Sequence, residues 1–151
     1  VVFEDAGNIE SRTHMMSAAM MGATAFQKCL GAIHALSHPV GSIHGTHHGL
    51  TNAVFMPYVL AFNRPQIEEK VGRLSSYLGL PATFSGFMEW VLELRSMLAI
   101  PHTLEELIRD DSRFAEMSEM APRDPTAGGN PIPINSETCL ELYRRAWSGN
   151  I

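Results

Sequence analysis

The sequence predicts an all-α fold, a bundle of about six to eight helices, and three observations support this class. Apolar residues recur at the three-, four- and seven-residue spacings that place side chains on one helix face. No stretch of any length alternates apolar and polar residues in the manner of a β-strand. Typical helix start and stop signals separate the apolar segments. The 151 residues, 45% of them apolar, fit a single domain over residues 1–151 with a core of its own.

The first predicted helix runs from residue 9 to about residue 30. Asn8 precedes it, and its side chain can accept a hydrogen bond from a free amide at the helix start. Apolar residues spaced seven, four and three apart predict one buried stripe along this helix, formed by Ile9, Met16, Met20 and Ala23.

Two further helices flank a glycine-rich segment. The second helix begins at Gly31, and Pro39 is expected to end or kink it because proline lacks the amide hydrogen that the helix uses. Glycines then mark a predicted loop, at Gly41, Gly45 and Gly49. The third helix begins at residue 48 or 49, is expected to kink at Pro57, and is expected to stop at residues 63–65.

Two amphipathic helices follow in the second half of the chain. The first covers residues 65–81, begins with a proline, and is closed by Gly79. The second covers residues 83–100, and its predicted core residues are Phe84, Phe87, Trp90, Val91, Leu94 and Leu98.

The remainder of the chain is predicted to alternate between short helices and irregular structure. Residues 101–120 are expected to form one or two short acidic helices, and residues 121–135 are dense in proline and glycine. The last helix covers residues 136–149, with Ser136 as its cap.

Composition excludes several classes of function. A net charge of −5 and a pI near 5.8, with scattered basic residues, argue against a nucleic-acid partner. No apolar stretch is long enough to span a membrane, so we expect no membrane partner. Cys29 and Cys139 lie far apart and form no disulfide framework, which favours a reducing compartment, the cytoplasm.

Five of the seven histidines lie within residues 34–49. His34 and His38 are four residues apart, as are His44 and His48, and this spacing places two imidazoles on one helix face where they can converge on a metal ion. The zinc-protease pattern is excluded because Ala35 stands where that pattern requires glutamate. A metal site remains one interpretation of the cluster, and exposed loop histidines are the other.

The histidines also belong to a longer pattern. The segment LGAIHALSHPVGSIHGTHHGLTNAVFMPYVLAFN closely resembles the signature of the iron-containing (group III) alcohol dehydrogenases, Gly-x-x-His-x-x-x-His-Pro-x-Gly followed by His-Gly-x-x-Asn-Ala. The segments NIESRTHMMSAAMMGATAF and TAGGNPIPINSETCLELYRRAW are similar to the preceding and the last parts of the same region. The resemblance covers nearly the whole chain in order and implies the C-terminal helical domain of that family.

The resemblance implies a role for each histidine of the signature. His34 and His48 correspond to metal ligands, and His38 corresponds to a residue that handles substrate or protons beside the metal and the nicotinamide. His47 stands where the family usually has proline, but Gly49 and the spacing from His34 favour His48 as the ligand. His44 and His47 are expected to be exposed residues outside the site.

The implied chemistry is oxidation of a small alcohol, or reduction of an aldehyde, by hydride transfer with NAD(P). A divalent metal on neutral imidazoles lowers the pKa of an alcohol, and a free imidazole can relay the proton. Asn52, in the His-Gly-x-x-Asn part of the signature, either orients the metal-site backbone by a hydrogen bond or serves capping or packing.

Two features of the family are missing from these residues. No glycine-rich phosphate-binding turn of a dinucleotide-binding domain is present, so NAD(P) binding is expected only with that N-terminal domain as a partner. The family's other metal ligands form an Asp-x-x-x-His pair, whereas Asp5 is followed at the fourth position by Ile9. We therefore expect two ligands to hold Fe²⁺ or Zn²⁺ weakly or not at all, and the isolated chain to be inactive.

Two alternatives belong to other classes of protein. A truncated gene could leave a free-standing helical interaction or assembly module without redox activity, and the face left exposed by the missing domain would favour homo-oligomers. The third interpretation is a metal-storage site formed by histidines alone, namely His34, His44, His47 and His48.

Overall fold

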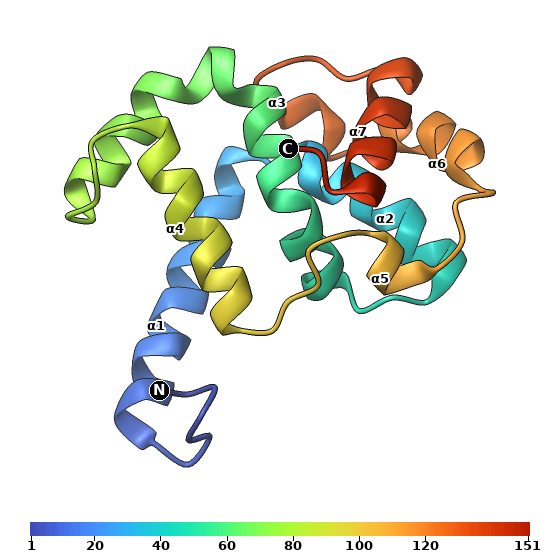
Figure 1. The fold of residues 1–151 in the computed structure, drawn as a ribbon. Coiled ribbons are helices and arrows are strands. Elements are labelled where there is room, and N and C mark those ends of the chain that lie inside the picture. Colours follow the sequence, from blue (N-terminus) through green and yellow to red (C-terminus); the bar gives the residue numbers. More distant parts are fainter.

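Seven α-helices and three 3₁₀ turns make up the structure, a computed structural model that describes residues 1–151 (Figure 1). The helices are α1 (Ile9–Ala25), α2 (Ala32–His44), α3 (His48–Tyr77), α4 (Phe84–Met97), α5 (Glu105–Ile108), α6 (Phe114–Met120) and α7 (Ser136–Ser148). The 3₁₀ turns are Phe26–Lys28, Ala121–Arg123 and Ala127–Gly129. The predicted all-α class is confirmed. None of the helices combines the length and the apolar character needed to cross a membrane.

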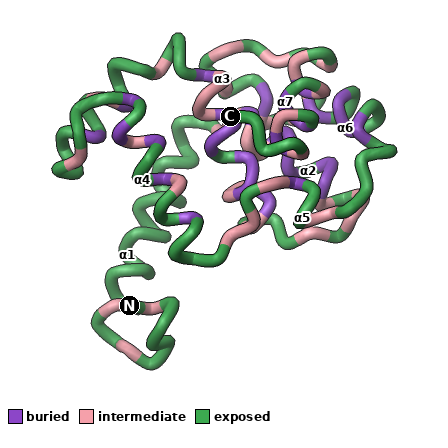
Figure 2. Tube along the Cα trace, in the orientation of Figure 1, coloured by how far each residue is buried: buried purple, intermediate pink, exposed green.

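The main core lies where α2, the first part of α3, α6 and α7 meet, and Figure 2 shows the buried residues concentrated there. Tyr143 of α7 occupies its centre, with its ring against Phe55 and Phe114. Its hydroxyl donates a hydrogen bond of 2.8 Å to the backbone carbonyl of Leu36 in α2. A buried tyrosine needs such a partner for its hydroxyl, so this bond fixes α7 against α2.

Helix α2 does not end at Pro39, where the sequence predicted either an end or a kink. It continues to His44, with Pro39 and Gly41 inside it. Pro39 is buried, as are Ala35, Leu36 and Val40, and α2 packs against α3, α6 and the 3₁₀ turn at 121–123. This packing outweighs the roughly 3 kcal/mol that proline costs inside a helix. Gly45 ends the helix with φ of 66°, a left-handed conformation that glycine adopts without strain.

Helix α3 continues through residues 63–65, where the sequence analysis predicted its end. It runs for 30 residues with both Pro57 and Pro65 inside it. Arg64 supports the continuation, because its guanidinium pairs with Glu68 one turn later at 2.6 Å and lies over the ring of Phe84. Figure 1 shows that α3 bends, so that its first part lies in the main body and its last part lies beside α4. Gly79 follows the end of α3 with φ of 73°, as predicted.

A smaller core joins the end of α3 to α4. Val71, Phe84 and Met88 form this cluster, and Thr83 caps α4 by accepting a hydrogen bond from the amide of Gly86. The predicted burial of Phe84 and Val91 is confirmed. The predicted burial of three others is wrong, because they are more than a third exposed, namely Trp90, Leu94 and Leu98. Only one side of α4 packs against α3. The apolar face of α4 is wider than this contact, so the apolar residues at its edges stay exposed.

The last third of the chain agrees with its prediction apart from one cap. Helices α5 and α6 are short, as expected. Helix α7 begins at Ser136, but the cap is Asn135, which accepts from the amide of Thr138 while Thr138 returns a bond to the amide of Asn135. This reciprocal pair satisfies two amides at the helix start. Cys29 and Cys139 are both unpaired.

The start of α2 is held by Asn130, which follows the 3₁₀ turn at 127–129. Its Oδ1 accepts from the amide of Ala32 at 3.1 Å and from Nδ2 of Asn63 at 2.9 Å. Its Nδ2 donates to Oδ1 of Asn63 at 2.8 Å and to the carbonyl of Ile132 at 2.7 Å. Gly129 lies so close to Leu30 that a Cβ there would fall 1.8 Å from the carbonyl oxygen, which only glycine avoids.

Helix α1 has none of the burial that was predicted for it. Asn8 caps it as expected, accepting from the amide of Ser11 at 2.9 Å. No residue of α1 is buried, and it extends away from the main body (Figures 1 and 2). The predicted stripe is wrong, since Ile9 and Met16 are each 74% exposed and Met20 is 67% exposed. Methionine pairs place apolar side chains on more than one side of α1, which is typical of a helix surrounded by other elements.

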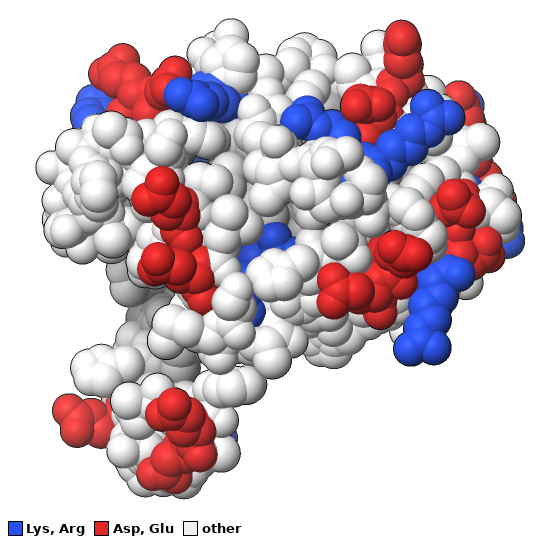
Figure 3. All heavy atoms as spheres, viewed as in Figure 1, with Lys and Arg blue, Asp and Glu red and all other residues white.

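Figure 3 shows charged side chains of both signs on one face of the molecule. Acidic groups gather along α4 and near the N-terminus, and basic groups are scattered elsewhere. This distribution agrees with the net charge of −5.

We predict that Asn130→Ala lowers the free energy of unfolding by about 2–4 kcal/mol, because it leaves the Ala32 amide and the Asn63 side chain without partners. Urea unfolding followed by circular dichroism measures this change. The matched control is Asn150→Ala, which removes an exposed side chain near the C-terminus and is expected to stay within about 0.5 kcal/mol of the unmodified chain. Equal effects of the two changes would contradict the role given to Asn130.

A second prediction concerns α1. The double change Met16→Glu and Met20→Glu is expected to leave the thermal midpoint of the chain nearly unchanged, because both side chains are already in water. The control change Met117→Glu places a carboxylate at a fully buried position of the main core and is expected to prevent folding. A large loss of stability in the α1 variant would show that α1 packs on the chain itself.

Candidate metal centre

Three histidines meet where α2 lies beside the start of α3. His34 and His38 lie one turn apart on α2, and His48 is the first residue of α3. The ring centroids of His34 and His48 are 5.2 Å apart, and those of His38 and His48 are 5.1 Å apart in a stacked arrangement. His34 and His38 are 6.0 Å apart. The structure therefore brings together the three histidines that the sequence analysis selected.

Asn52 shows how two of these rings are oriented. It lies on α3, one turn after His48, and its Nδ2 is 3.0 Å from Nε2 of His48 and 3.3 Å from Nε2 of His34. An amide NH₂ group has two hydrogens to donate, so it can satisfy both nitrogen lone pairs at once. The Nε2 atoms of His34 and His48 thus converge on one point. The Oδ1 of Asn52 is buried and has no hydrogen-bond partner.

The surroundings keep His34 uncharged. Burial lowers the pKa of the His34 imidazole below its ordinary value, and the neighbouring His48 and His38 lower it further, while Asp124 acts in the opposite direction. A neutral imidazole is the form that binds a metal ion. The edge of the Phe26 ring lies against His34, with the ring centroids 5.8 Å apart.

His38 has a different partner. Its Nδ1 is 2.7 Å from Oδ2 of Asp124, a residue in the segment between α6 and α7. No hydrogen bond joins His38 to Asn52. His38 therefore differs from His34 and His48, which both face the amide of Asn52.

The other two histidines of the segment have separate surroundings. His44 is the last residue of α2, and its Nε2 is buried without a hydrogen-bond partner. His47 caps α3, with its Nδ1 accepting from the amide of Leu50 at 3.3 Å. Their positions are those of residues that end one helix and begin the next.

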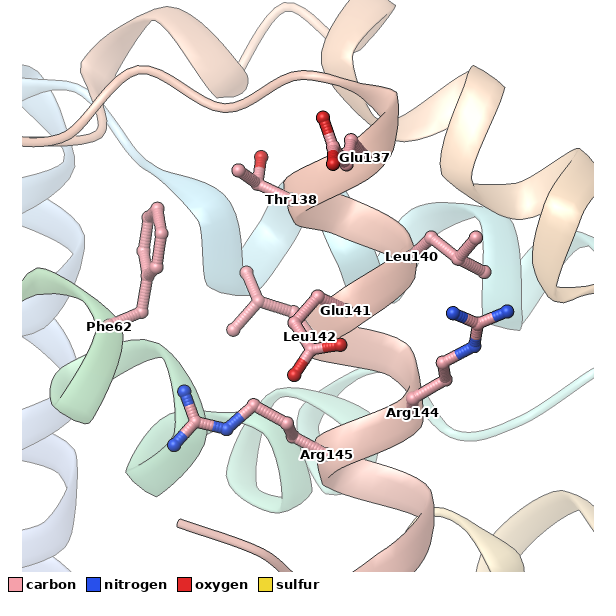
Figure 4. Close-up of a pocket in the computed structure, with 8 residues that line it drawn as sticks. All are labelled: Phe62, Glu137, Thr138, Leu140, Glu141, Leu142, Arg144 and Arg145. Atoms are coloured by element: carbon pink, nitrogen blue, oxygen red, sulfur yellow. The ribbon is translucent and has the colours of Figure 1, made fainter.

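One hollow of the surface adjoins the histidine cluster, and another lies away from it. One of about 230 Å³ lies beside His34 and is also bordered by Cys29, Asn63 and Asn130. Another, of about 350 Å³, lies along α7, where Figure 4 shows side chains from α7 and Phe62 of α3 around it. No histidine borders the second hollow, so only the first adjoins the cluster.

The donor set fits half of a metal site. The Nε2 atoms of His34 and His48 converge on the Asn52 amide, and imidazole nitrogens are suitable ligands for Fe²⁺ or Zn²⁺ when such an amide gives way to the metal. No group of three or more His, Cys, Asp or Glu side chains is arranged to hold a metal ion. The fold and this site define the chain as a helical domain in which the Nε2 atoms of two histidines face one side-chain amide.

The comparisons with known proteins agree with the helical fold. The chain belongs to the Fe-containing alcohol dehydrogenase family, since residues 1–147 match the model of the family's C-terminal part. It is 35% identical over 147 residues to an alcohol dehydrogenase of Thermococcus barophilus, covering 93% of this chain and 38% of that protein. It is also 35% identical over 150 residues to a 4-hydroxybutyrate dehydrogenase of Cupriavidus necator, with the same coverage.

A solved structure shows the same fold. A 1,3-propanediol oxidoreductase superposes with a TM-score of 0.85 at 28% identity, covering 93% of this chain and 39% of that one. The chain therefore spans less than two fifths of the length of these relatives. The comparisons confirm the family and the C-terminal helical domain expected from the sequence. They give no support to an interaction module without redox chemistry.

Sequence reasoning did not find Asp124. It lies 86 residues from His38 and just before the Thr-x-Gly-Gly-Asn-Pro segment, which was noted only as part of the resemblance. Asn52 was noted, but with backbone orientation, capping or packing as its possible roles. In the structure its amide contacts the histidine side chains instead.

Proposed function

We propose that this chain is the metal-bearing helical part of an NAD(P)-dependent alcohol dehydrogenase. His34 and His48 are two of the metal ligands, and His38 handles the proton of a small alcohol or aldehyde. The observation that carries the proposal is the convergence of the Nε2 atoms of His34 and His48 on a single nitrogen of Asn52, in a chain of the Fe-containing alcohol dehydrogenase family.

Each residue has a distinct task in this proposal. His34 and His48 present their Nε2 atoms, which the Asn52 amide contacts when no metal is bound. A bound Fe²⁺ or Zn²⁺ supplies the Lewis acidity that lowers the pKa of an alcohol hydroxyl. His38 lies against His48 and keeps its Nε2 free of partners within the chain, so it can accept a proton from a substrate beside the pair.

The rest of the activity belongs to the remaining part of the longer protein. We propose that this part provides the NAD(P)-binding domain and the two other metal ligands. The relatives are more than twice as long as this chain, which leaves room for both. Helix α1 supports the proposal as well, because its exposed methionines on several sides suit a helix packed among other elements.

Metal binding by the 151-residue chain tests the ligand assignment. We expect Zn²⁺ to bind weakly, since two ligands are fewer than the three or four of stable sites. His34→Gln and His48→Gln are each expected to weaken binding at least about tenfold by calorimetry. His44→Gln is the matched control and is expected to bind Zn²⁺ like the unmodified chain.

His38→Gln separates the two assignments made within the cluster. Unchanged Zn²⁺ affinity is expected, and a loss as large as that of His34→Gln would make His38 a third ligand.

Turnover by the isolated chain provides a second test of the proposed function. The isolated chain, given Zn²⁺ or Fe²⁺, NAD(P)⁺ and a panel of alcohols, is expected to show none, and robust turnover would contradict the assignment of the cofactor site to another domain.

A further inference from the structure

Asp124 is held from both sides in the turn that follows the 3₁₀ turn at 121–123. Its Oδ2 lies 2.7 Å from Nδ1 of His38. Its Oδ1 accepts two hydrogen bonds from Thr126, one from the amide at 2.8 Å and one from the hydroxyl at 2.6 Å. The side chain of Asp124 is only 15% exposed. One carboxylate oxygen is thus occupied by Thr126, and the other is directed at His38.

We propose that Asp124 is a positioning residue that holds His38 in the tautomer with the proton on Nδ1. The assignment concerns the orientation and tautomer of His38, and only the use of its free nitrogen rests on the proposed function. Thr126 completes the arrangement by fixing the carboxylate. Asp124 itself touches neither a substrate nor the converging nitrogens of His34 and His48.

The carboxylate of Asp124 determines which nitrogen of His38 carries the proton. An ionised carboxylate only accepts hydrogen bonds, so the imidazole nitrogen beside it must carry the proton. Burial raises the pKa of Asp124, but the hydrogen bonds from Thr126 and His38 outweigh it, so the net pKa lies below its ordinary value. Asp124 is therefore ionised at neutral pH, and a neutral His38 has its lone pair on Nε2.

No other hydrogen bond in the chain fixes the orientation of the His38 ring. His38 is 41% exposed and forms no hydrogen bond besides that to Asp124. Its ring stacks on His48 with an interplanar angle of 18°. Without the carboxylate, rotation about the Cβ–Cγ bond would exchange the positions of Nδ1 and Cδ2 and those of Nε2 and Cε1, and either nitrogen could carry the proton. With it, Nε2 stays on the side of the ring turned away from Asp124 as a proton acceptor.

Nitrogen NMR of the ¹⁵N-histidine-labelled 151-residue chain tests the inference, because two-bond couplings distinguish the two neutral tautomers. The spectrum is recorded at a pH of about 8.5, well above the ordinary histidine pKa. We expect His38 to be predominantly protonated on Nδ1. Predominant protonation on Nε2, or an even mixture, in the unmodified chain would overturn the proposal without the need for any variant.

Two variants assign the cause. Asp124→Ala is expected to change the ratio of the His38 tautomers at least about tenfold toward the Nε2-protonated form, as expected for the loss of a charge-assisted bond. Asp111→Ala, at an exposed aspartate whose side chain makes no hydrogen bond, is the matched control and is expected to leave the ratio unchanged. An unchanged ratio in a folded Asp124→Ala chain would show that Asp124 does not set the tautomer.

The same samples separate this inference from the proposed function. Zn²⁺ added alone is expected to shift the Nε2 signals of His34 and His48. Absence of that shift contradicts the metal assignment and leaves the tautomer result for His38 intact. A wrong tautomer together with normal Zn²⁺ shifts contradicts only the role of Asp124.

Discussion

A pair of side-chain amides, those of Asn63 and Asn130, holds together the segments on which the histidine cluster depends. The pair exchanges two hydrogen bonds, and Asn130 also accepts from the first amide of α2 and donates to the chain that leads into α7. Every hydrogen-bonding position of the Asn130 side chain is therefore used. Helix α2 carries His34 and His38, α3 carries His48, and the segment after α6 carries Asp124. Their relative placement follows from this junction and from the core below it.

Local sequence patterns predicted the helices well where neighbouring residues alone determine how a helix begins or ends. Asn8 caps α1, Gly79 follows α3, and no strand forms. The patterns predicted an end at Pro65, and an end or a kink at Pro39, but neither helix ends there, because the packing of α2 on its neighbours and of the last part of α3 on α4 favours continuation more strongly than proline opposes it. They also failed for α1, since periodicity shows that a helix needs apolar neighbours but not whether they belong to the same chain.

The candidate site divides in the same way. Clustering and spacing drew attention to five histidines, and the resemblance to the family signature selected His34, His38 and His48 among them. Asp124 could not be predicted from the sequence, because its contact with His38 spans 86 residues and depends on how the chain returns after α6. The contact of the Asn52 amide with both histidines depends on the angle between α2 and α3, and sequence spacing does not give that angle. Patterns along the chain thus identify ligand candidates, whereas the groups that orient them come from tertiary structure.

The turn between α2 and α3 contains only residues 45–47, with Gly45 in the left-handed conformation. Because so short a connection allows few conformations, the imidazoles of His34 and His48 are preorganised, and under the proposed function a metal ion would bind both at almost no cost in chain entropy. Tight binding then depends on the effective concentration at which the other ligands are presented. Under the proposed function, a bound metal ion would link this chain to the part that supplies the other ligands, and by linkage it would strengthen their association to the same degree.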